Sequence, residues 1–262
     1  MYKMSEIIDV VEKFCPPSIA ADWDNVGLLL GRAQANVSKI LLALDVTDDV
    51  VDEAVKGSYC AIFTHHPLMR SGIKEITDKT PFGNRLLTLA ENKIAVYSAH
   101  TNLDFCQDGV NDQLALTLGL ENIHGICEVS SGIFAGRAGT LSSEMNLANF
   151  AKLVKEKLHL DHITFCGQNN APIHKVGVMG GGGANEDFFK AALDANCDVY
   201  VTSDIKYSMA LAAADIGLNL IDATHYATEW VFTQSLIQLF KKQLPNLEVM
   251  VTKIDGQPFK GC

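Results

Sequence analysis

Hydrophobic positions in the first part of the chain form short continuous runs separated by stripes of helical period. Continuous apolar runs at 39–45, 59–64 and 94–98 are typical of strands that are buried on both faces of a parallel sheet. Apolar residues spaced three or four positions apart predict helices at 47–57 and 83–92, between these strands. Strand and helix therefore alternate, which indicates a parallel α/β sheet.

The two ends of the chain carry further elements with the same patterns. A helix is predicted at 4–14, where Pro16 and Pro17 end the stripe, and a short strand follows a turn at 21–31. Near the other end, the pattern predicts a helix at 227–240 and a closing strand at 247–252.

The middle of the chain repeats the alternation after a change in character. Serine and glycine at 130–132, followed by Gly136 and Arg137, indicate a domain boundary near 128. Strands are expected at 137–141, 163–166, 175–179, 199–202 and 218–221, with helices at 146–158, 186–197 and 205–216. We predict an α/β protein of two interlinked domains with mostly parallel sheets. Domain 1 comprises residues 1–128 and is completed by 222–262, and domain 2 comprises 129–221.

Composition and charge narrow the class of protein. The 262 residues are 48% hydrophobic and carry a formal net charge of −10, which argues against general affinity for nucleic acid phosphates. Seven cysteines occur singly and no CxxC pair is present, which is typical of reduced thiols. No secretory signal is evident, and no apolar run approaches the roughly 18 residues of a membrane span. We expect a cytoplasmic protein without a membrane partner.

Two adjacent histidines, His65 and His66, follow the apolar run 59–64, and Pro67 prevents easy continuation of the strand. Ligands of α/β proteins bind outside the carboxyl ends of strands, and imidazole is the commonest metal-binding side chain. At a strand end the chain can turn both side chains towards one site, where each serves a different metal. The alternative is that one histidine caps the next element while the other is solvated.

Two further strand ends carry side chains of the same chemical type. The strand 94–98 leads to His100 and Asp104; Asp104 is a candidate carboxylate ligand, and His100 is a candidate ligand, supporting partner or proton carrier. The alternative here is a loop stabilised by Asn and Asp turns. His225 and Glu229 lie four residues apart at the start of a helix, so both side chains share one face.

Taken together, these residues suit a hydrolytic centre with two metal ions. The helix N-terminus would by itself disfavour a cation, so a metal there needs the Glu229 carboxylate, which can bridge both ions. The ligands are nitrogen and oxygen atoms, which leaves zinc, manganese, iron and nickel as open alternatives. The predicted metal ligands are His65, His66, Asp104, His225 and Glu229.

Two other segments allow a structural and a functional interpretation. Gly180 to Gly183 precede a helix and can either cradle an anion or allow close packing of strand and helix, but they lack the lysine of a P-loop. Trp23 is predicted to fill the core and Asp24 to form a turn, with a supporting role beside a ligand as the alternative for Asp24 or Asn25.

The combination of motifs resembles one known family, the GTP cyclohydrolase 1 type 2 homologues, also called NGG-interacting-factor-like dinuclear metal proteins. The resemblance extends over essentially the whole chain and rests on residues 24–28, 64–67, 100–104, 180–183, 202–207 and 225–229. It implies two α/β domains with two divalent metals in the cleft between them, bound by the five ligands above. It also implies a homohexamer, and this chain resembles the short form. Departures from the family pattern are Ser208, where a histidine is frequent, and Thr224, where glycine is usual.

Two functions are compatible with these observations. The first is a metal-dependent hydrolase that acts on a nucleotide or another phosphorylated small molecule, with His100 as the catalytic proton carrier. If the family name applies, the reaction opens the guanine ring of GTP with release of formate. The second is a non-catalytic module that binds metal or a protein partner.

Overall fold

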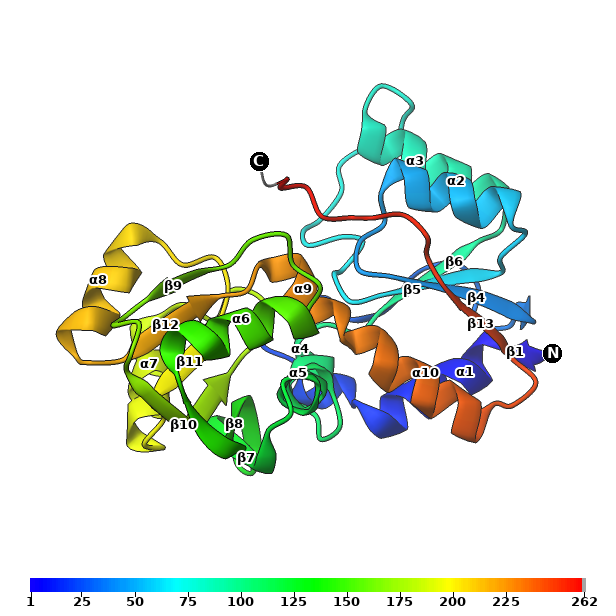
Figure 1. The fold of residues 1–262 in the computed structure, drawn as a ribbon. Helices are drawn as coiled ribbons and strands as arrows, with labels where there is room; N and C mark the ends of the chain where they lie inside the picture. Colours follow the sequence, from blue (N-terminus) through cyan, green and yellow to red (C-terminus); the bar gives the residue numbers. More distant parts are fainter. Residues whose placement is uncertain (261–262) are drawn as a thin grey trace. The chain divides into compact units, whose positions relative to one another are not determined.

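The computed structural model describes residues 1–260, which form two compact units (Figure 1). Unit 1 comprises residues 1–106 and 232–256, and unit 2 comprises 107–231 together with the segment from 257 onwards. Each unit is therefore built from two separate segments of the chain.

Unit 1 contains a five-stranded sheet in the order β13-β4-β5-β6-β2, in which only the β2–β6 pair is antiparallel. A two-stranded ribbon, β1 with β3, accompanies it. The strands are β1 (Tyr2–Lys3), β2 (Gly27–Leu30), β3 (Asn36–Val37), β4 (Lys39–Ala43), β5 (Ala61–Thr64), β6 (Ala95–Ser98) and β13 (Glu248–Val251). The helices are α1 (Met4–Phe14), a 3-10 turn at Pro17–Ile19, α2 (Asp48–Lys56), α3 (Pro81–Glu91), α4 (Thr101–Phe105) and α10 (Phe232–Gln243).

Helices cover both faces of the unit 1 sheet, with α2 and α3 on one side and α1 and α10 on the other (Figure 1). Side chains alternate along each strand, so Ile62 packs in the cluster formed with α2 and α3, whereas Phe63 packs against Phe240 of α10. This double burial explains why β4, β5 and β6 are continuous apolar runs in the sequence.

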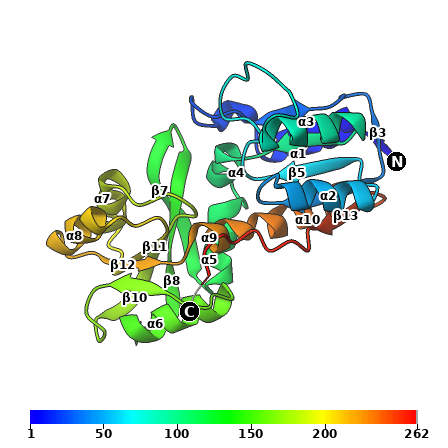
Figure 2. The same cartoon turned by 90° about the horizontal axis from the view of Figure 1, so that it is seen from above.

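Unit 2 contains a six-stranded mixed sheet in the order β7-β8-β10-β11-β12-β9. The β10–β11 and β11–β12 pairs are parallel and the other three pairs are antiparallel. The strands are β7 (Glu121–Ser130), β8 (Ile133–Asn146), β9 (Thr164–Cys166), β10 (Pro172–Val178), β11 (Val199–Thr202) and β12 (Asn219–Asp222). The helices are α5 (Val110–Thr117), α6 (Leu147–Lys157), α7 (Glu186–Asp194), α8 (Tyr207–Asp215) and α9 (His225–Trp230). Figure 2 shows α6 on the opposite face of this sheet from α7 and α8.

The limits of the units differ from the domain limits expected from the sequence. The serine and glycine residues near 130 form the tip of the β7–β8 hairpin, so residues 107–128 belong to unit 2. Likewise β12 pairs with β11 through Asp222, and residues 222–231 stay with unit 2. The expectation of mostly parallel sheets describes unit 1, whereas the unit 2 sheet is mixed.

None of the helices within residues 1–260 has both the length and the apolar character that a membrane crossing requires.

Candidate metal-binding residues

The parallel register of β4, β5 and β6 sets three strand ends level with one another. Ala43 pairs with Thr64, which in turn pairs with Ser98. Parallel strands end at the same edge of their sheet, so the residues two places further on reach a common position. These residues are Asp45, His66 and His100.

Three histidines of unit 1 form one group at this edge. His65, His66 and His100 each offer a ring nitrogen, and these atoms all lie within 4.8 Å of one another. The ring centroids are 5.4 Å apart for His65 and His66, and 5.1 Å apart for His65 and His100. His65 is fully buried and His66 is 9% exposed. The sequence predicted ligands at His65 and His66, and the structure places His100 in the same group.

The Nδ1 atom of each adjacent histidine has an acceptor beside it. His65 Nδ1 lies 3.0 Å from the carbonyl oxygen of Ala99, and His66 Nδ1 lies 2.8 Å from Asp45 Oδ1. An acceptor at this position keeps the proton on Nδ1 and directs the lone pair of Nε2 outward, which is the arrangement of metal-binding histidines.

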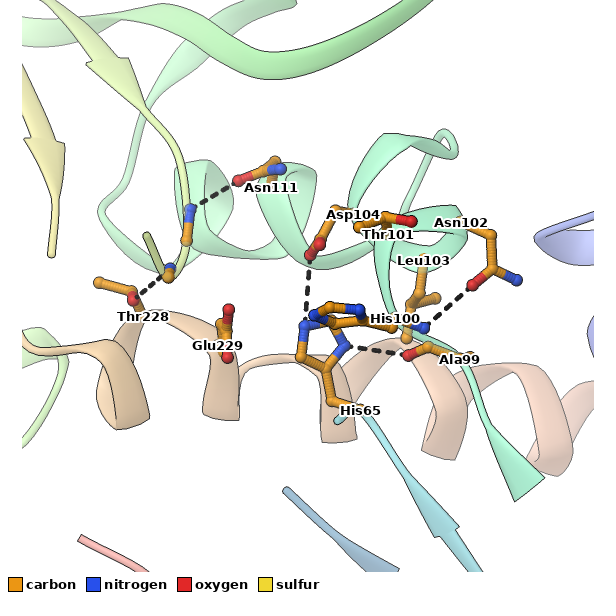
Figure 3. Close-up of polar contacts among 12 residues, drawn as sticks. His65, Ala99, His100, Thr101, Asn102, Leu103, Asp104, Asn111, Thr228 and Glu229 are labelled. Carbon is orange, nitrogen blue, oxygen red and sulfur yellow. Dashed lines mark hydrogen bonds and ion pairs between the residues drawn. The ribbon is translucent and has the colours of Figure 1, made fainter. Parts of the chain in front are cut away.

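Asp104 reaches the histidine group from the short helix α4, in a segment for which the sequence predicted a ligand, with a loop as the alternative. Its Oδ1 atom lies 3.5 Å from His65 Nε2, and the residue is 8% exposed (Figure 3). With the proton held on Nδ1, the Nε2 lone pair of His65 faces a carboxylate oxygen. Two electron-pair donors facing each other repel unless a cation or proton lies with them, so this donor set fits a divalent metal.

His100 is held by a carboxylate that the sequence interpretation treated mainly as a turn-former. His100 Nδ1 lies 2.9 Å from Asp24 Oδ1, while Asp24 Oδ2 accepts hydrogen bonds from the backbone N–H (3.0 Å) and hydroxyl (2.5 Å) of Thr101. Burial alone would raise the pKa of Asp24, but the bonds from His100 and Thr101 outweigh burial and hold that pKa far below its usual range. Asp24 is therefore ionised and fixes the orientation of the His100 ring.

The candidate ligands of unit 2 lie on α9. His225 and Glu229 are one helical turn apart, and His225 Nε2 lies 3.0 Å from Glu229 Oε2. His225 Nδ1 lies 2.7 Å from Asp204 Oδ2, so a carboxylate again orients the ring. The His225 side chain is 35% exposed, whereas that of Glu229 is 4% exposed.

These two carboxylates set the protonation of His225. Burial lowers its pKa, but the hydrogen bonds and charges of Glu229 and Asp204 raise the pKa of His225 to about 9. Without metal, the imidazolium therefore lies between two acidic groups at neutral pH. A metal that binds Nε2 has to displace this proton.

The glycine turn at residues 180–183 packs closely against His225 and Glu229 of α9. A Cβ atom on Gly181 would lie 1.9 Å from Glu229 Oε1 and 3.3 Å from His225 Nε2, and Gly181 has a φ of +65°. Three N–H groups of this turn are engaged inside the protein: Gly180 donates to Asn111 Oδ1 (2.8 Å), Gly181 donates to Thr228 Oγ1 (3.0 Å; Figure 3), and Gly183 donates to the carbonyl oxygen of Gly181 (2.9 Å). Of the two interpretations of this turn, the geometry favours close packing over an anion cradle.

The helix α9 begins at a strained residue. Thr224 has φ 60° and ψ 145°, a region that glycine adopts readily and other residues rarely do. Its hydroxyl oxygen accepts hydrogen bonds from the N–H of Ala227 (3.4 Å) and from Gln257 Nε2 (3.2 Å). The side chain thus caps the helix that carries His225 and Glu229.

Sequence reasoning missed two of the three carboxylates beside the histidine rings, Asp45 and Asp204, and misplaced Trp23. Asp45 and Asp204 follow strands, as the candidate ligands do. A parallel pairing of the strands before Asp45 and His66, had it been proposed, would have identified Asp45 as the neighbour of His66. Trp23 was expected in the core, but it is 72% exposed because hydrogen bonds to Asp24 hold its turn at the surface.

Comparison with known proteins gives matches along the whole chain. Residues 2–258 match the family described as Duf34/NIF3 (NGG1p interacting factor 3). A Clostridium perfringens protein named GTP cyclohydrolase 1 type 2 homolog is 34% identical over 261 residues, covering 98% of this chain and 99% of that protein. Protein NIF3 homolog of Schizosaccharomyces pombe is 32% identical over 97% of this chain and 96% of its own length.

The fold has a close counterpart among solved structures. The Staphylococcus aureus protein SA1388 superposes with a TM-score of 0.91 at 29% identity, covering 99% of each chain. A Staphylococcus epidermidis relative, also named GTP cyclohydrolase 1 type 2 homolog, aligns with 98% of this chain over 367 positions. That alignment is longer than the 262 residues here, which makes this chain a short form.

Proposed function

This chain belongs to the Duf34/NIF3 family, and on that premise we propose that it is a divalent-metal-dependent hydrolase of a nucleotide or another phosphorylated small molecule. The name GTP cyclohydrolase 1 type 2 homolog, carried by its relatives, makes GTP the first substrate to test. Two ions are proposed, and zinc, manganese, iron and nickel are all compatible with the ligand types. The proposed ligands are His65, His66, Asp104, His225 and Glu229.

The observation that carries this proposal is the group of three histidines at the end of the unit 1 sheet. Their ring nitrogens lie within 4.8 Å of one another, and the Nδ1 atoms of His65 and His66 each face an oxygen acceptor. Structural histidines that only fill a core do not require three rings in contact with orienting acceptors. This arrangement supports metal binding through Nε2.

Bound divalent ions would lower the pKa of a water molecule and polarise the bond under attack. The protein's own contribution is proton transfer and orientation. Asp24 holds the proton of His100 on Nδ1 through its 2.9 Å contact, so Nε2 is the atom that can accept and return a proton. We propose His100 as this proton carrier and Asp24 as the residue that positions it.

Reconstitution with single metals tests the proposal. Protein loaded with manganese, iron, zinc or nickel should bind about two ions per chain and hydrolyse at least one member of a nucleotide and phosphoester panel that includes GTP. His65→Ala and Glu229→Ala should reduce both metal content and rate. His124→Ala, which removes an exposed histidine outside both groups, should change neither.

A non-catalytic module is the second candidate, and the family description as an interacting factor favours it. Under that function, His65→Ala and Glu229→Ala lower the metal content, yet no metal form turns over any member of the panel. Turnover that survives both substitutions would contradict the proposed centre altogether.

We also propose assembly into a homohexamer, which rests on the family resemblance. Light scattering coupled to size exclusion should give about six times the mass of one chain. A monomeric mass would contradict this proposal without affecting the metal ligands.

A further inference from the structure

We propose that the cavity beside Trp23 is a subsite for a small molecule that carries both a planar aromatic ring and an anionic group, as a nucleotide does. The inference deepens the proposed function. It rests on that function in one respect only, namely that the bound ligand is also the substrate. Binding in this cavity needs neither metal nor turnover, so the two can be tested separately.

The cavity lies within unit 1 and has a volume of about 570 Å³. Pockets for small molecules typically measure roughly 300–1,000 Å³, so the space suits a ligand of nucleotide size. Two short segments line it, residues 23–25 and residues 69–73. The first segment is the turn that carries Trp23, and the second begins the long loop before α3.

The turn at 21–24 holds the Trp23 indole at the surface. Asp24 N–H donates to the carbonyl of Ala21 (2.9 Å), and Ala21 N–H donates to Thr101 Oγ1 (2.9 Å). Asp24 Oδ2 accepts two further hydrogen bonds from Thr101. Both ends of the turn are thus fastened to α4, and Trp23 remains 72% exposed at its corner. A rigid, exposed indole next to a cavity is a ready stacking platform for a planar ring.

Arg70 supplies a cation on the opposite lining segment. It is exposed and, within residues 1–260, makes neither an ion pair nor a hydrogen bond. The acid in the lining, Asp24, is already engaged by His100 and Thr101 and is largely buried. Its oxygens are therefore occupied by these partners, and the Arg70 guanidinium stays available for a carboxylate or phosphate, which it can bind with two parallel hydrogen bonds.

The two segments are joined to each other and to His100. Asn25 Nδ2 donates to the carbonyl oxygen of Met69 (2.7 Å), which fixes the start of the loop next to Arg70. The Trp23 ring meets the His100 ring edge to face, with centroids 5.9 Å apart. A ring stacked on Trp23 would consequently lie close to the residue proposed to carry protons.

This pairing of groups selects the class of ligand. An apolar molecule would leave the Arg70 charge without a partner, and inorganic phosphate would make no use of the indole. A molecule with both a heteroaromatic ring and a phosphate engages both groups at once. The chain as a whole carries a net charge of −10, which repels an anion, so binding of the phosphate depends on the local positive charge of Arg70.

Fluorescence of Trp23 in metal-free protein provides the test. The chain has two tryptophans, so Trp230→Phe leaves Trp23 as the sole reporter. GTP should quench this fluorescence saturably, whereas guanosine and tripolyphosphate should bind at least about tenfold more weakly. Trp23→Leu and Arg70→Gln should each weaken GTP binding by about tenfold in calorimetry. Lys74→Gln, which removes an exposed cation of the same loop outside the cavity lining, should leave the affinity unchanged.

The outcomes separate this inference from the proposed hydrolase. Saturable binding without turnover in any metal form supports the subsite and contradicts the hydrolase. Turnover with a KM that Trp23→Leu and Arg70→Gln leave unchanged overturns the subsite and supports the hydrolase. Equal binding of GTP by the parent and both variants overturns the subsite. A Trp23 fluorescence spectrum that no ligand changes, because another copy of the chain covers the indole, overturns it as well.

Discussion

In unit 1 the candidate ligands His65 and His66 directly follow a strand of the sheet, whereas in unit 2 both candidate ligands lie on the short helix α9. His65 and His66 extend β5 directly, and the neighbouring strands supply the acceptors beside them. His225 and Glu229 instead depend on a six-residue helix that begins at the strained Thr224. The same chemical groups are thus held by two different kinds of local structure.

The difference concerns how many independent contacts hold each ligand. In unit 1 the hydrophobic core behind the sheet fixes the strands, and the strands fix the histidines. In unit 2 the positions of His225 and Glu229 depend on Gly181, Asp204 and Thr224, each through one close contact or one backbone conformation. Single substitutions should therefore disturb the unit 2 pair more than the unit 1 group.

The largest effect is expected for Gly181→Ala. A Cβ atom there would lie 1.9 Å from Glu229 Oε1 and the φ of +65° is unfavourable for alanine. We expect a loss of about 1–3 kcal/mol in the free energy of unfolding and at least about a tenfold loss of metal affinity. Urea unfolding and chelator competition measure the two effects. Gly182→Ala is the matched control, because its Cβ would come no closer than 3.9 Å to any neighbour; equal effects of both variants would contradict the role of Gly181.

Removing the carboxylates beside the ligand histidines compares the units directly. Asp204→Ala should lower metal affinity by about 10- to 100-fold, since it removes the acceptor that orients His225. Asp45→Ala should have a smaller effect, because the His66 ring is 9% exposed and remains packed among two other histidines. Chelator competition with zinc or manganese measures both. An equal or larger loss for Asp45→Ala would reverse the comparison.

The pH dependence of the metal-free protein should show the His225 contribution. Its folded pKa of about 9 lies above the unfolded value of about 6.5. The stabilisation is therefore fully present below pH ~6.5 and disappears as pH rises through ~9. We expect the melting temperature of the parent to fall over this interval, measured by calorimetry in the presence of a chelator. His225→Gln should lack this part of the decline; an identical decline in both proteins would contradict the assignment.

The smallest effect is expected at Thr224, where strain and capping oppose each other. Thr224→Gly removes the strain of φ 60° and should stabilise the protein by up to about 1 kcal/mol, because glycine is nearly as good an N-cap. Thr224→Ala keeps the strain and loses the cap, so it should destabilise by about 1 kcal/mol. Thermal melts of the two variants give opposite shifts if the strain is real, and shifts of the same sign would contradict it.

The local hydrophobic pattern predicted the positions of the helices and strands better than it predicted which segments pair with each other. The helix at 4–14 and the strand leading to His65 were expected within one or two residues of their observed limits, because burial periodicity is a local property. The β7–β8 hairpin was missed, since its turn residues resemble a domain boundary. All five proposed ligands could be named from strand and helix ends. Asp45 and Asp204, which orient the rings, depend on register between strands distant in sequence, and single residues do not reveal that register.

The contacts of Nδ1 make two adjacent, chemically identical residues unequal. His65 has a neutral carbonyl oxygen of Ala99 beside it, whereas His66 has the carboxylate of Asp45. A negatively charged acceptor draws the ring proton outward and enriches the imidazole in electron density, so His66 is the stronger electron donor of the two. The sequence His-His therefore encodes two candidate ligands of different donor strength. Two ions of the same element bound through these rings would differ in Lewis acidity.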